Sequence, residues 1–566
     1  MLLTLMLFTV TLWGQQPQVA IPGRQTPQPA QTLKPEELCS VSGVVKHAVT
    51  GEALRKATLT LWPMESRNAA VPSTTVTDAE GKFSMKEIEP GQYRFTAVRT
   101  GFVQTNYRST PANRQGATLT LAKGQSVKDV EFRLLPHAVI SGRVTDEDGD
   151  PIQHAQVQLM IYRTMQGKRQ LMPASGGSTN DLGEYRLFGI APGRYYLSVT
   201  QRPNYAFAGG VDRSAVQAPD ESYPMTYFPG TLEVTGASPL NVASGATMQG
   251  VDVMLRKVRS FRVRGRVTGI GSGMRGGNVT VMPKSAAGNA MGFSMMQQGT
   301  MWRGPGGEFE LRGVRPGSYF VMAHAWEPPS KQFIGRETIE VGNEDVEGVT
   351  LTLSSGVEVN GSLRVESDTP TEAKFEEMFV ALSPPAMFVP VYTTPGKVTR
   401  EGSFQIANAT AETYNVRVMG MPPEFFVKSV RMGDIDVMEN GLTVSGTPVS
   451  GVDVVISPKG AEVSGTVTDK DGKLLAAAAV VLHPLSAKPS RQAELQRMAS
   501  ADQNGAFRFR GLPPGEYRLY AFEGIEGGEA GDADLLKEHE AKAVTLSLKE
   551  GAREARELKA VLVENR

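Results

Sequence analysis

The chain has 566 residues, which is too long for a single hydrophobic core and long enough for roughly three to six domains. It carries 59 Lys and Arg against 59 Asp and Glu, and the resulting net charge of zero excludes a nucleic-acid binder that works through bulk charge. The single cysteine, Cys39, excludes an intrachain disulfide and any zinc site built on several cysteines.

The chain begins with an uncharged apolar segment, residues 1–13. This segment is shorter than the about 20 residues that a membrane-spanning helix needs, and it predicts the apolar region of a secretory signal peptide, with a buried strand as the alternative. A Gln- and Pro-rich stretch typical of a linker follows. We therefore assign residues 1–37 to a signal peptide and linker, and we expect a secreted, periplasmic or cell-surface protein. Cys39 is expected to be a half-buried free thiol at the start of the first strand.

One short phrase, a glycine flanked two positions away on each side by an apolar residue, recurs five times. Its glycines are Gly43, Gly142, Gly265, Gly361 and Gly465. Successive copies lie about 100 residues apart, which is the length of one β-sandwich and far too long for a solenoid repeat.

Each unit then carries a turn in which a glycine stands two positions before an aromatic residue. The complete form, Asp/Asn-x-x-Gly-x-Phe/Tyr, occupies residues 78–83, 180–185 and 502–507, and a shortened form occupies residues 307–309 and 402–404. Asp or Asn opens such a turn by bonding its own backbone, and Gly supplies a positive φ. The aromatic residue is predicted to start a strand and to point inward.

A second turn, Pro-Gly-x-Tyr, follows at residues 90–93, 192–195, 316–319 and 514–517. Pro and Gly form the tight turn, and the tyrosine begins an alternating strand. Its hydroxyl can reach nearby backbone, as in the tyrosine corner of β-sandwiches. The fourth unit lacks Pro-Gly but keeps Tyr414, so we expect its sandwich to persist with a different turn.

Alternating apolar and polar residues close every unit, as strands with one wet face require, and the best helical candidate is confined to residues 534–542. The sequence therefore predicts an all-β protein, a tandem array of five Ig-like or transthyretin-like antiparallel β-sandwiches. The predicted domains are residues 38–136, 137–257, 258–356, 357–459 and 460–566, and the fourth is the most divergent.

The order of these motifs resembles the carboxypeptidase regulatory-like domain, a transthyretin-like sandwich that is grouped with carbohydrate-binding-like folds. The resemblance covers nearly all of residues 38–566 and is strongest in units one, two and five. Several copies behind an export signal are similar to the layout of secreted proteins of soil bacteria. The resemblance implies the fold, but it is barely specific for an activity, because such folds host many functions.

Few side chains suit catalysis or metal binding. His324 and Glu327 match a His-x-x-Glu zinc pair, but they lie along and at the exit of a predicted strand, with no catalytic domain around them. The glycine-rich stretch 269–277 leads into another strand and not into a helix, so it predicts a hairpin and not a phosphate loop. Asp146 and the acids after it could offer oxygen ligands to Ca²⁺, but a polar turn is favoured. We predict no enzyme activity, no metal site and no cofactor.

A basic stripe runs along the first strand of unit three, where alternation places Arg262, Arg264 and Arg266 on one face. Such a row could meet an acidic polysaccharide or lipid headgroups. We favour the alternative of a solvent-facing strand that pairs with an acidic neighbour.

Aromatic side chains gather in two insertions, and loops at the end of a rigid sandwich commonly carry binding sites. Flat rings would suit stacking on sugars. The candidate ligand-binding residues are Tyr223, Tyr227, Phe228 and Trp302, and the insertion of unit two, residues 201–239, also holds Tyr205 and Phe207. The alternative is a structural use, in which the rings plug the end of the sandwich.

We predict a non-enzymatic, exported binding or scaffold protein of the bacterial envelope or exterior, with carbohydrate as the leading ligand. One alternative is a purely structural stalk or assembly partner, and a less favoured one is a component linked to carboxypeptidase activity. The predicted partner is a polysaccharide or another envelope protein, with no nucleic acid and no membrane span in the mature chain.

Overall fold

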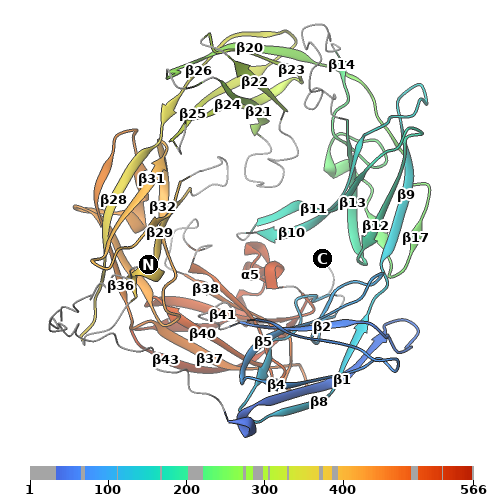
Figure 1. Ribbon diagram of the computed structural model, residues 1–566, viewed down its shortest axis with the longest axis vertical. Coiled ribbons are helices and arrows are strands. Elements are labelled where there is room, and N and C mark those ends of the chain that lie inside the picture. Colours follow the sequence, from blue (N-terminus) through green and yellow to red (C-terminus); the bar gives the residue numbers. More distant parts are fainter. Residues whose placement is uncertain are drawn as a thin grey trace, which may run out of the picture.

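Five β-sandwiches follow one another around a closed ring, with the first sandwich beside the fifth (Figure 1). The computed structural model describes residues 34–563 except 65–70, 111, 166–167, 202–220, 272–273, 275, 285–297, 304–305, 328–330, 369–373, 385–392, 486–491, 493–494 and 526. The predicted signal peptide lies outside the described residues. The all-β fold class is confirmed. We propose that the five domain ranges predicted from the sequence correspond to the five sandwiches.

The first sandwich packs a sheet of order β4-β1-β8 against a sheet of order β3-β2-β5-β6, in which β7 also pairs with β5. Its strands are β1 (Cys39–His47), β2 (Thr58–Pro63), β3 (Ser73–Val76), β4 (Lys82–Ile88), β5 (Gly91–Val98), β6 (Thr105–Asn106), β7 (Leu119–Leu121) and β8 (Ser126–Leu134). Cys39 begins β1 as predicted, but it is fully buried and not half-buried, and its thiol donates to the carbonyl of Ala122.

The second sandwich differs by a long hairpin, β10–β11, at the edge of its larger sheet. Its strands are β9 (Ala138–Thr145), β10 (Gln156–Met165), β11 (Lys168–Ser178), β12 (Glu184–Ile190), β13 (Gly193–Thr200), β14 (Glu221–Ser222), β15 (Thr226–Tyr227), β16 (Leu240–Val242), β17 (Thr247–Met248) and β18 (Val253–Met254), with the 3₁₀ turn η2 (Val234–Gly236). Strand β14 pairs with β19 (Val258–Arg259), at the junction with the third sandwich.

The third sandwich has a three-stranded sheet, β23-β20-β26, and a five-stranded sheet, β22-β21-β24-β25-β27. Its strands are β20 (Phe261–Thr268), β21 (Gly276–Pro283), β22 (Gln298–Arg303), β23 (Glu308–Val314), β24 (Gly317–Glu327), β25 (Lys331–Val341), β26 (Val346–Thr352) and β27 (Ser354–Ser355). The glycine-rich stretch connects β20 to β21, which confirms that it leads from strand to strand.

The fourth sandwich keeps the fold in spite of its divergent sequence, with sheets of order β31-β28-β36-β33-β34 and β30-β29-β32-β35. Its elements are η4 (Phe375–Glu377), β28 (Val357–Val365), β29 (Phe379–Ser383), β30 (Gly396–Lys397), β31 (Ser403–Ala409), β32 (Glu412–Met419), β33 (Phe426–Met432), β34 (Ile435–Asp436), α2 (Val437–Asn440), β35 (Leu442–Val444) and β36 (Val449–Ser457). Tyr414 is fully buried, and its hydroxyl donates to the carbonyl of Thr410, so the tyrosine persists without the Pro-Gly turn.

The fifth sandwich carries the helices that the sequence placed near residues 534–542. Its elements are β37 (Ala461–Thr468), β38 (Ala479–Pro484), β39 (Arg497–Ser500), β40 (Ala506–Leu512), β41 (Gly515–Glu523), α4 (Gly527–Ala530), α5 (Ala533–Glu538), η5 (Glu540–Lys542), β42 (Val544–Leu548), β43 (Arg553–Lys559) and β44 (Val561–Leu562). Leu535 and Leu536 of α5 pack with Val481 and Phe522 in a second core beside the main one.

In every sandwich the first strand pairs antiparallel with the strand of the aromatic turn and parallel with the strand that closes the unit. In the first sandwich, for example, β1 is antiparallel to β4 and parallel to β8. The parallel pair is a feature that the sequence pattern did not predict. Each unit therefore ends beside the C-terminal end of its first strand, as Leu134 does beside His47, and the next unit starts after a short connection such as residues 135–137 or 458–460.

The repeated glycine is required where these two strands meet. A Cβ built on any of the five glycines would lie closer than 3.0 Å to a backbone carbonyl oxygen of the closing segment, such as that of Val349 opposite Gly265 or, between β17 and β18, that of Val251 opposite Gly142. On the other side, each glycine is paired with the aromatic residue of the turn, as Gly265 is with Phe309 and Gly142 with Tyr185. The ring covers the surface that a glycine leaves empty, a recognised way to stabilise glycine in a sheet.

The two predicted turns form with the expected chemistry. The carboxylate of Asp502 accepts hydrogen bonds from the backbone N–H groups of Asn504 (2.8 Å) and Ala506 (2.9 Å), and Gly505 has a φ of 71°. At the second turn, the hydroxyl of Tyr517 donates to the carbonyl of Pro513 at 2.8 Å. Equivalent bonds from Tyr93 and other corner tyrosines reach the residue four positions earlier. The prediction that these hydroxyls bond backbone is confirmed.

We expect Gly265→Ala to destabilise the third sandwich by about 2 kcal/mol, because the added methyl group meets backbone that cannot move aside cheaply. Trp302 is buried in the same core, so its fluorescence during urea-induced unfolding reports on this sandwich. Gly342→Ala is the matched control, since a Cβ there meets nothing within 4 Å. Equal stability of the two variants would contradict the close-approach argument.

Candidate functional site

The basic stripe of the third sandwich lies on β20, and strand alternation separates its charged and apolar residues as predicted. Phe261, Val263 and Val267 are buried in the core. Arg264 and Arg266 lie on the opposite face, where β23 and β26 flank the strand. The functional question is therefore whether these arginines face a ligand or face acidic residues of the same sheet.

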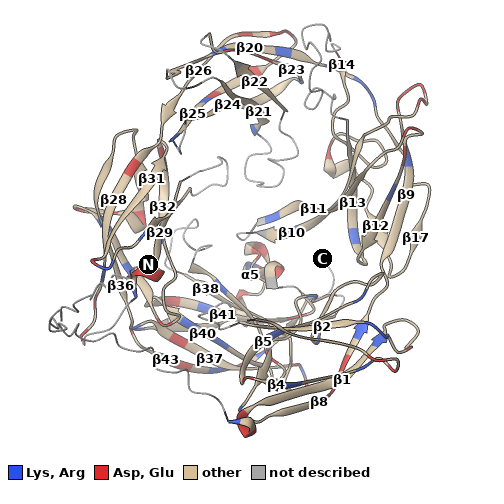
Figure 2. Ribbon diagram, viewed as in Figure 1, with Lys and Arg blue, Asp and Glu red and all other residues tan. Residues whose placement is uncertain are grey.

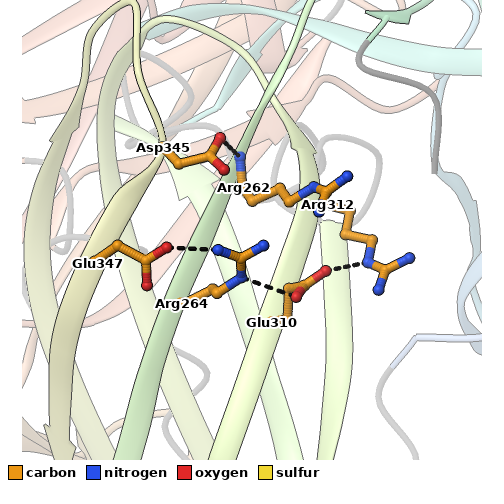
Figure 3. A network of polar contacts seen from close by, with 6 residues as sticks. All are labelled: Arg262, Arg264, Glu310, Arg312, Asp345 and Glu347. Carbon is orange, nitrogen blue, oxygen red and sulfur yellow. Dashed lines mark hydrogen bonds and ion pairs between the residues drawn. The ribbon is translucent and has the colours of Figure 1, made fainter. Parts of the chain in front are cut away.

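Arg264 sits between two glutamates of the neighbouring strands (Figure 3). Its Nε donates to Glu310 on β23 at 2.9 Å, and its Nη1 donates to Glu347 on β26 at 2.6 Å. One guanidinium therefore ties all three strands of the sheet together. Such forked geometry suits arginine, whose planar group offers several donors in fixed directions.

Arg266 of the stripe and Arg312 on β23 also have acidic partners. Glu310 accepts a second bond from Arg312, and Arg266 lies 3.4 Å from Glu308. The backbone N–H of Arg262 donates to Asp345 at 2.9 Å. The acidic partners come from the same sheet, and the favoured interpretation of acidic pairing is confirmed for Arg264 and Arg266.

The network shifts the titration of its members in the expected directions. Partial burial of Glu310 opposes its ionisation, but the hydrogen bonds from Arg264 and Arg312 together outweigh this effect, so the pKa of Glu310 lies below its ordinary value. The pKa of Arg264 is raised, first by its hydrogen bond to Glu310 and then by the bond to Glu347.

The four aromatic candidates for ligand binding pack against the cores of their sandwiches. Trp302 is fully buried in the third core, and Tyr227 retains only 8% of its surface. Tyr223 and Phe228 are partly buried and pack against the second core. Ligand binding at these residues stays a prediction, and only Tyr223 and Phe228 offer substantial accessible ring surface. Tyr205 and Phe207 lie outside the described residues.

His324 and Glu327 have different surroundings from those of a zinc pair. The Nε2 atom of His324 lies 3.3 Å from Oε1 of Gln332 on the adjacent strand, and its ring lies beside Trp326 with centroids 6.3 Å apart. Within the part of the chain that the structure describes, no three His, Cys, Asp or Glu side chains gather in a way that could hold a metal ion. Asp146 uses its carboxylate in the turn, where it accepts from the N–H groups of Asp148 and Asp150.

Sequence reasoning missed the residues that join the first and fifth sandwiches. The side chain of Asn113 reaches the carbonyl of Ala477, and that of Gln503 reaches Thr120. The sequence offers one weak indication of this contact. Gln503 stands at the second position of the Asp-x-x-Gly turn, where the first two units have other residues, Ala79 and Asp181.

Comparison with known families identifies the repeated unit. Residues 40–134, 139–214 and 462–549 match the family model of the carboxypeptidase regulatory-like domain. Three of the five units are carboxypeptidase regulatory-like domains. These carboxypeptidase regulatory-like domains fall in the first, second and fifth units, where the sequence resemblance is strongest. A search of curated proteins found no match.

Solved structures with local similarity include pilins and a collagen-binding protein of bacteria. A minor pilin of Streptococcus agalactiae is 12% identical over 39% of this chain and 96% of the pilin, with a TM-score of 0.22. Two B repeats of the collagen-binding protein of Staphylococcus aureus are 10% identical over 69% of this chain and 93% of theirs, with a TM-score of 0.14. At these scores the likeness carries no argument about what the carboxypeptidase regulatory-like domains do here.

No helix among the described residues is long and apolar enough to cross a bilayer.

We expect Glu310→Gln to lower the stability of the third sandwich by about 1 kcal/mol or less at pH 7, because water screens a partly exposed pair. A lowered carboxyl pKa stabilises the fold fully above the unfolded-state value of 4.5, and this contribution is lost as the pH falls through the lower folded-state pKa. Urea-induced unfolding at pH 7 and at pH 3 should therefore show a difference between wild type and variant that shrinks in acid.

The control for this prediction is Glu344→Gln, which removes an exposed acid from the loop before β26. A loss of stability that is equal for both variants, or that grows in acid, would contradict the assigned role of Glu310.

Proposed function

We propose that the protein is an exported, non-enzymatic scaffold of the bacterial envelope or exterior, which holds binding surfaces in a defined arrangement. The observation that carries this proposal is that successive sandwiches contact one another directly. Arg336 of the third sandwich lies 3.7 Å from Glu412 of the fourth, and Lys428 of the fourth lies 2.9 Å from Glu550 of the fifth. Short connections and direct contacts both restrict the motion of neighbouring domains.

The distribution of charge supports a scaffold over an electrostatic binder. Basic and acidic residues are interspersed on all five sandwiches (Figure 2), in agreement with equal totals of 59 each. On β20, Arg264 and Arg266 pair with glutamates of their own sheet. A surface of this kind does not attract polyanions by long-range charge.

Carbohydrate is the ligand class that we propose for this scaffold, with Tyr223 and Phe228 as contact residues. Tyr223 follows β14 and Phe228 follows β15, and both rings pack against the second core while they keep part of their surface. The Nζ atom of Lys257 lies 5.9 Å from the centroid of the Tyr223 ring, which gives the site a hydrogen-bond donor beside an aromatic face. A structural stalk that assembles with another envelope protein is the alternative, and a link to carboxypeptidase activity is less favoured.

Export is tested by fusing residues 1–37 to an alkaline phosphatase that lacks its own signal, in a Gram-negative host. We expect phosphatase activity in the periplasm, because the apolar segment should direct secretion. A fusion that starts at residue 14 is the control and should stay inactive. Activity that is equally absent from both fusions would contradict the proposed export signal.

Carbohydrate binding is tested by a glycan-array screen of the chain from residue 38 onward. We expect retention of at least one polysaccharide and a loss of about tenfold in Phe228→Ala, the effect of removing one aromatic stack. Phe188→Ala removes a ring of the same sandwich that is 69% exposed and lies on β12, and it is the matched control. No retained glycan, with folding intact, would favour the structural stalk.

A further inference from the structure

One loop of the first sandwich, between β6 and β7, touches two other sandwiches. Asn113 donates from Nδ2 to the carbonyl of Ala477 in the fifth sandwich at 2.6 Å. The next residue, Arg114, donates to the carbonyl of Pro192 in the second sandwich. The loop therefore lies where the two ends of the ring meet, and it bonds backbone on both sides.

The side-chain amide of Asn113 has both of its functional groups hydrogen-bonded at this position. Its side chain is buried, and its Oδ1 accepts from the backbone N–H of Gln115 at 3.1 Å while its Nδ2 reaches Ala477. The amide thus holds the loop with one atom and the fifth sandwich with the other. A buried amide is tolerated only when both its donor and its acceptor are satisfied, as they are here.

Gln503 makes the reciprocal contact from the fifth sandwich. Its Nε2 donates to the carbonyl of Thr120 at 2.6 Å, and its Oε1 accepts from the N–H of the same residue at 2.9 Å. Thr120 is the middle residue of β7, which pairs with β5 alone. The side-chain amide therefore satisfies an open strand edge in the way that a peptide group of an added strand would.

Small groups complete the contact. Ser500 donates to the carbonyl of Gly116 at 2.5 Å, and Ala476 and Ala477 pack against the core of the first sandwich. Nearby, helix α4 of the fifth sandwich contacts β10 of the second. The hydrogen bonds that join the chain ends link neutral groups, so salt should weaken them little.

We propose that this surface is an intramolecular latch, in which the fifth sandwich of the same chain occupies the β7 edge and the Asn113 loop of the first. The occupant is identified by complementarity: the amide of Gln503 matches both backbone groups of Thr120, and the carbonyl of Ala477 matches the donor of Asn113. The bonded residues lie more than 360 positions apart in the sequence, so this contact joins the two ends of the series of sandwiches.

The test is the double variant Asn113→Asp/Gln503→Glu in the chain from residue 38 onward. Each change is nearly isosteric, keeps the accepting oxygen and replaces the donor with a charged acceptor that faces a carbonyl. We expect small-angle scattering at pH 7.5 to show an opened chain, with a maximum dimension larger by about one domain diameter, roughly 35 Å. Hydrogen exchange of the peptide around Thr120 should accelerate at least tenfold.

Asn180→Asp is the matched control, because it makes the same chemical change in a turn where other units already carry aspartate. It should leave both the scattering curve and the exchange at Thr120 unchanged. If the double variant misfolds by circular dichroism, Gln503→Glu alone, which changes a turn residue, supplies the same two measurements. A folded variant with the wild-type maximum dimension and a protected Thr120 would overturn the latch.

Discussion

The close approach of two backbones at a glycine is the constraint on which every sandwich depends. The first strand of each unit must accept the closing strand on one side and the aromatic turn on the other. Only glycine leaves room for the carbonyl that faces it, as at Gly265 and Val349, and the ring of Phe309 then covers the gap. The recurring glycine motif thus marks the place where three strands meet. The aromatic residue of the following turn completes the same contact.

This contact also governs how the sandwiches are joined. Because the closing strand runs parallel to the first, each unit ends beside the C-terminal end of its first strand, as Leu134 does beside His47, and the next unit starts within a few residues. Short connections leave little freedom between neighbours, and ion pairs such as Lys428 with Glu550 restrict it further. When the orientation of each sandwich relative to the next is restricted in this way, the series can curve until the first and the fifth sandwich meet. Figure 1 shows this arrangement.

Polar groups in this protein mainly hold its own parts together. Arg264 binds three strands of one sheet, the corner tyrosines bind their own turns, and Asn113 and Gln503 bind one sandwich to another. A protein that uses its arginines and amides in this way retains a defined shape. That property is what a scaffold needs, whichever molecule it finally holds.

Local patterns in the sequence were sufficient to predict the five sandwiches, the two turns and the inward alternation from Tyr93 to Ala97, because each depends on residues close together in the chain. The parallel closing strand, the acidic partners of Arg264 and the full burial of Trp302 depended on which distant strands become neighbours. The contact between Asn113 and Ala477 likewise depended on the tertiary structure, because no local sequence pattern links two residues that lie so far apart in the chain. The alternation of apolar and polar residues predicts on which face of a strand a side chain lies. Which residues lie opposite that face is decided only by the folded chain.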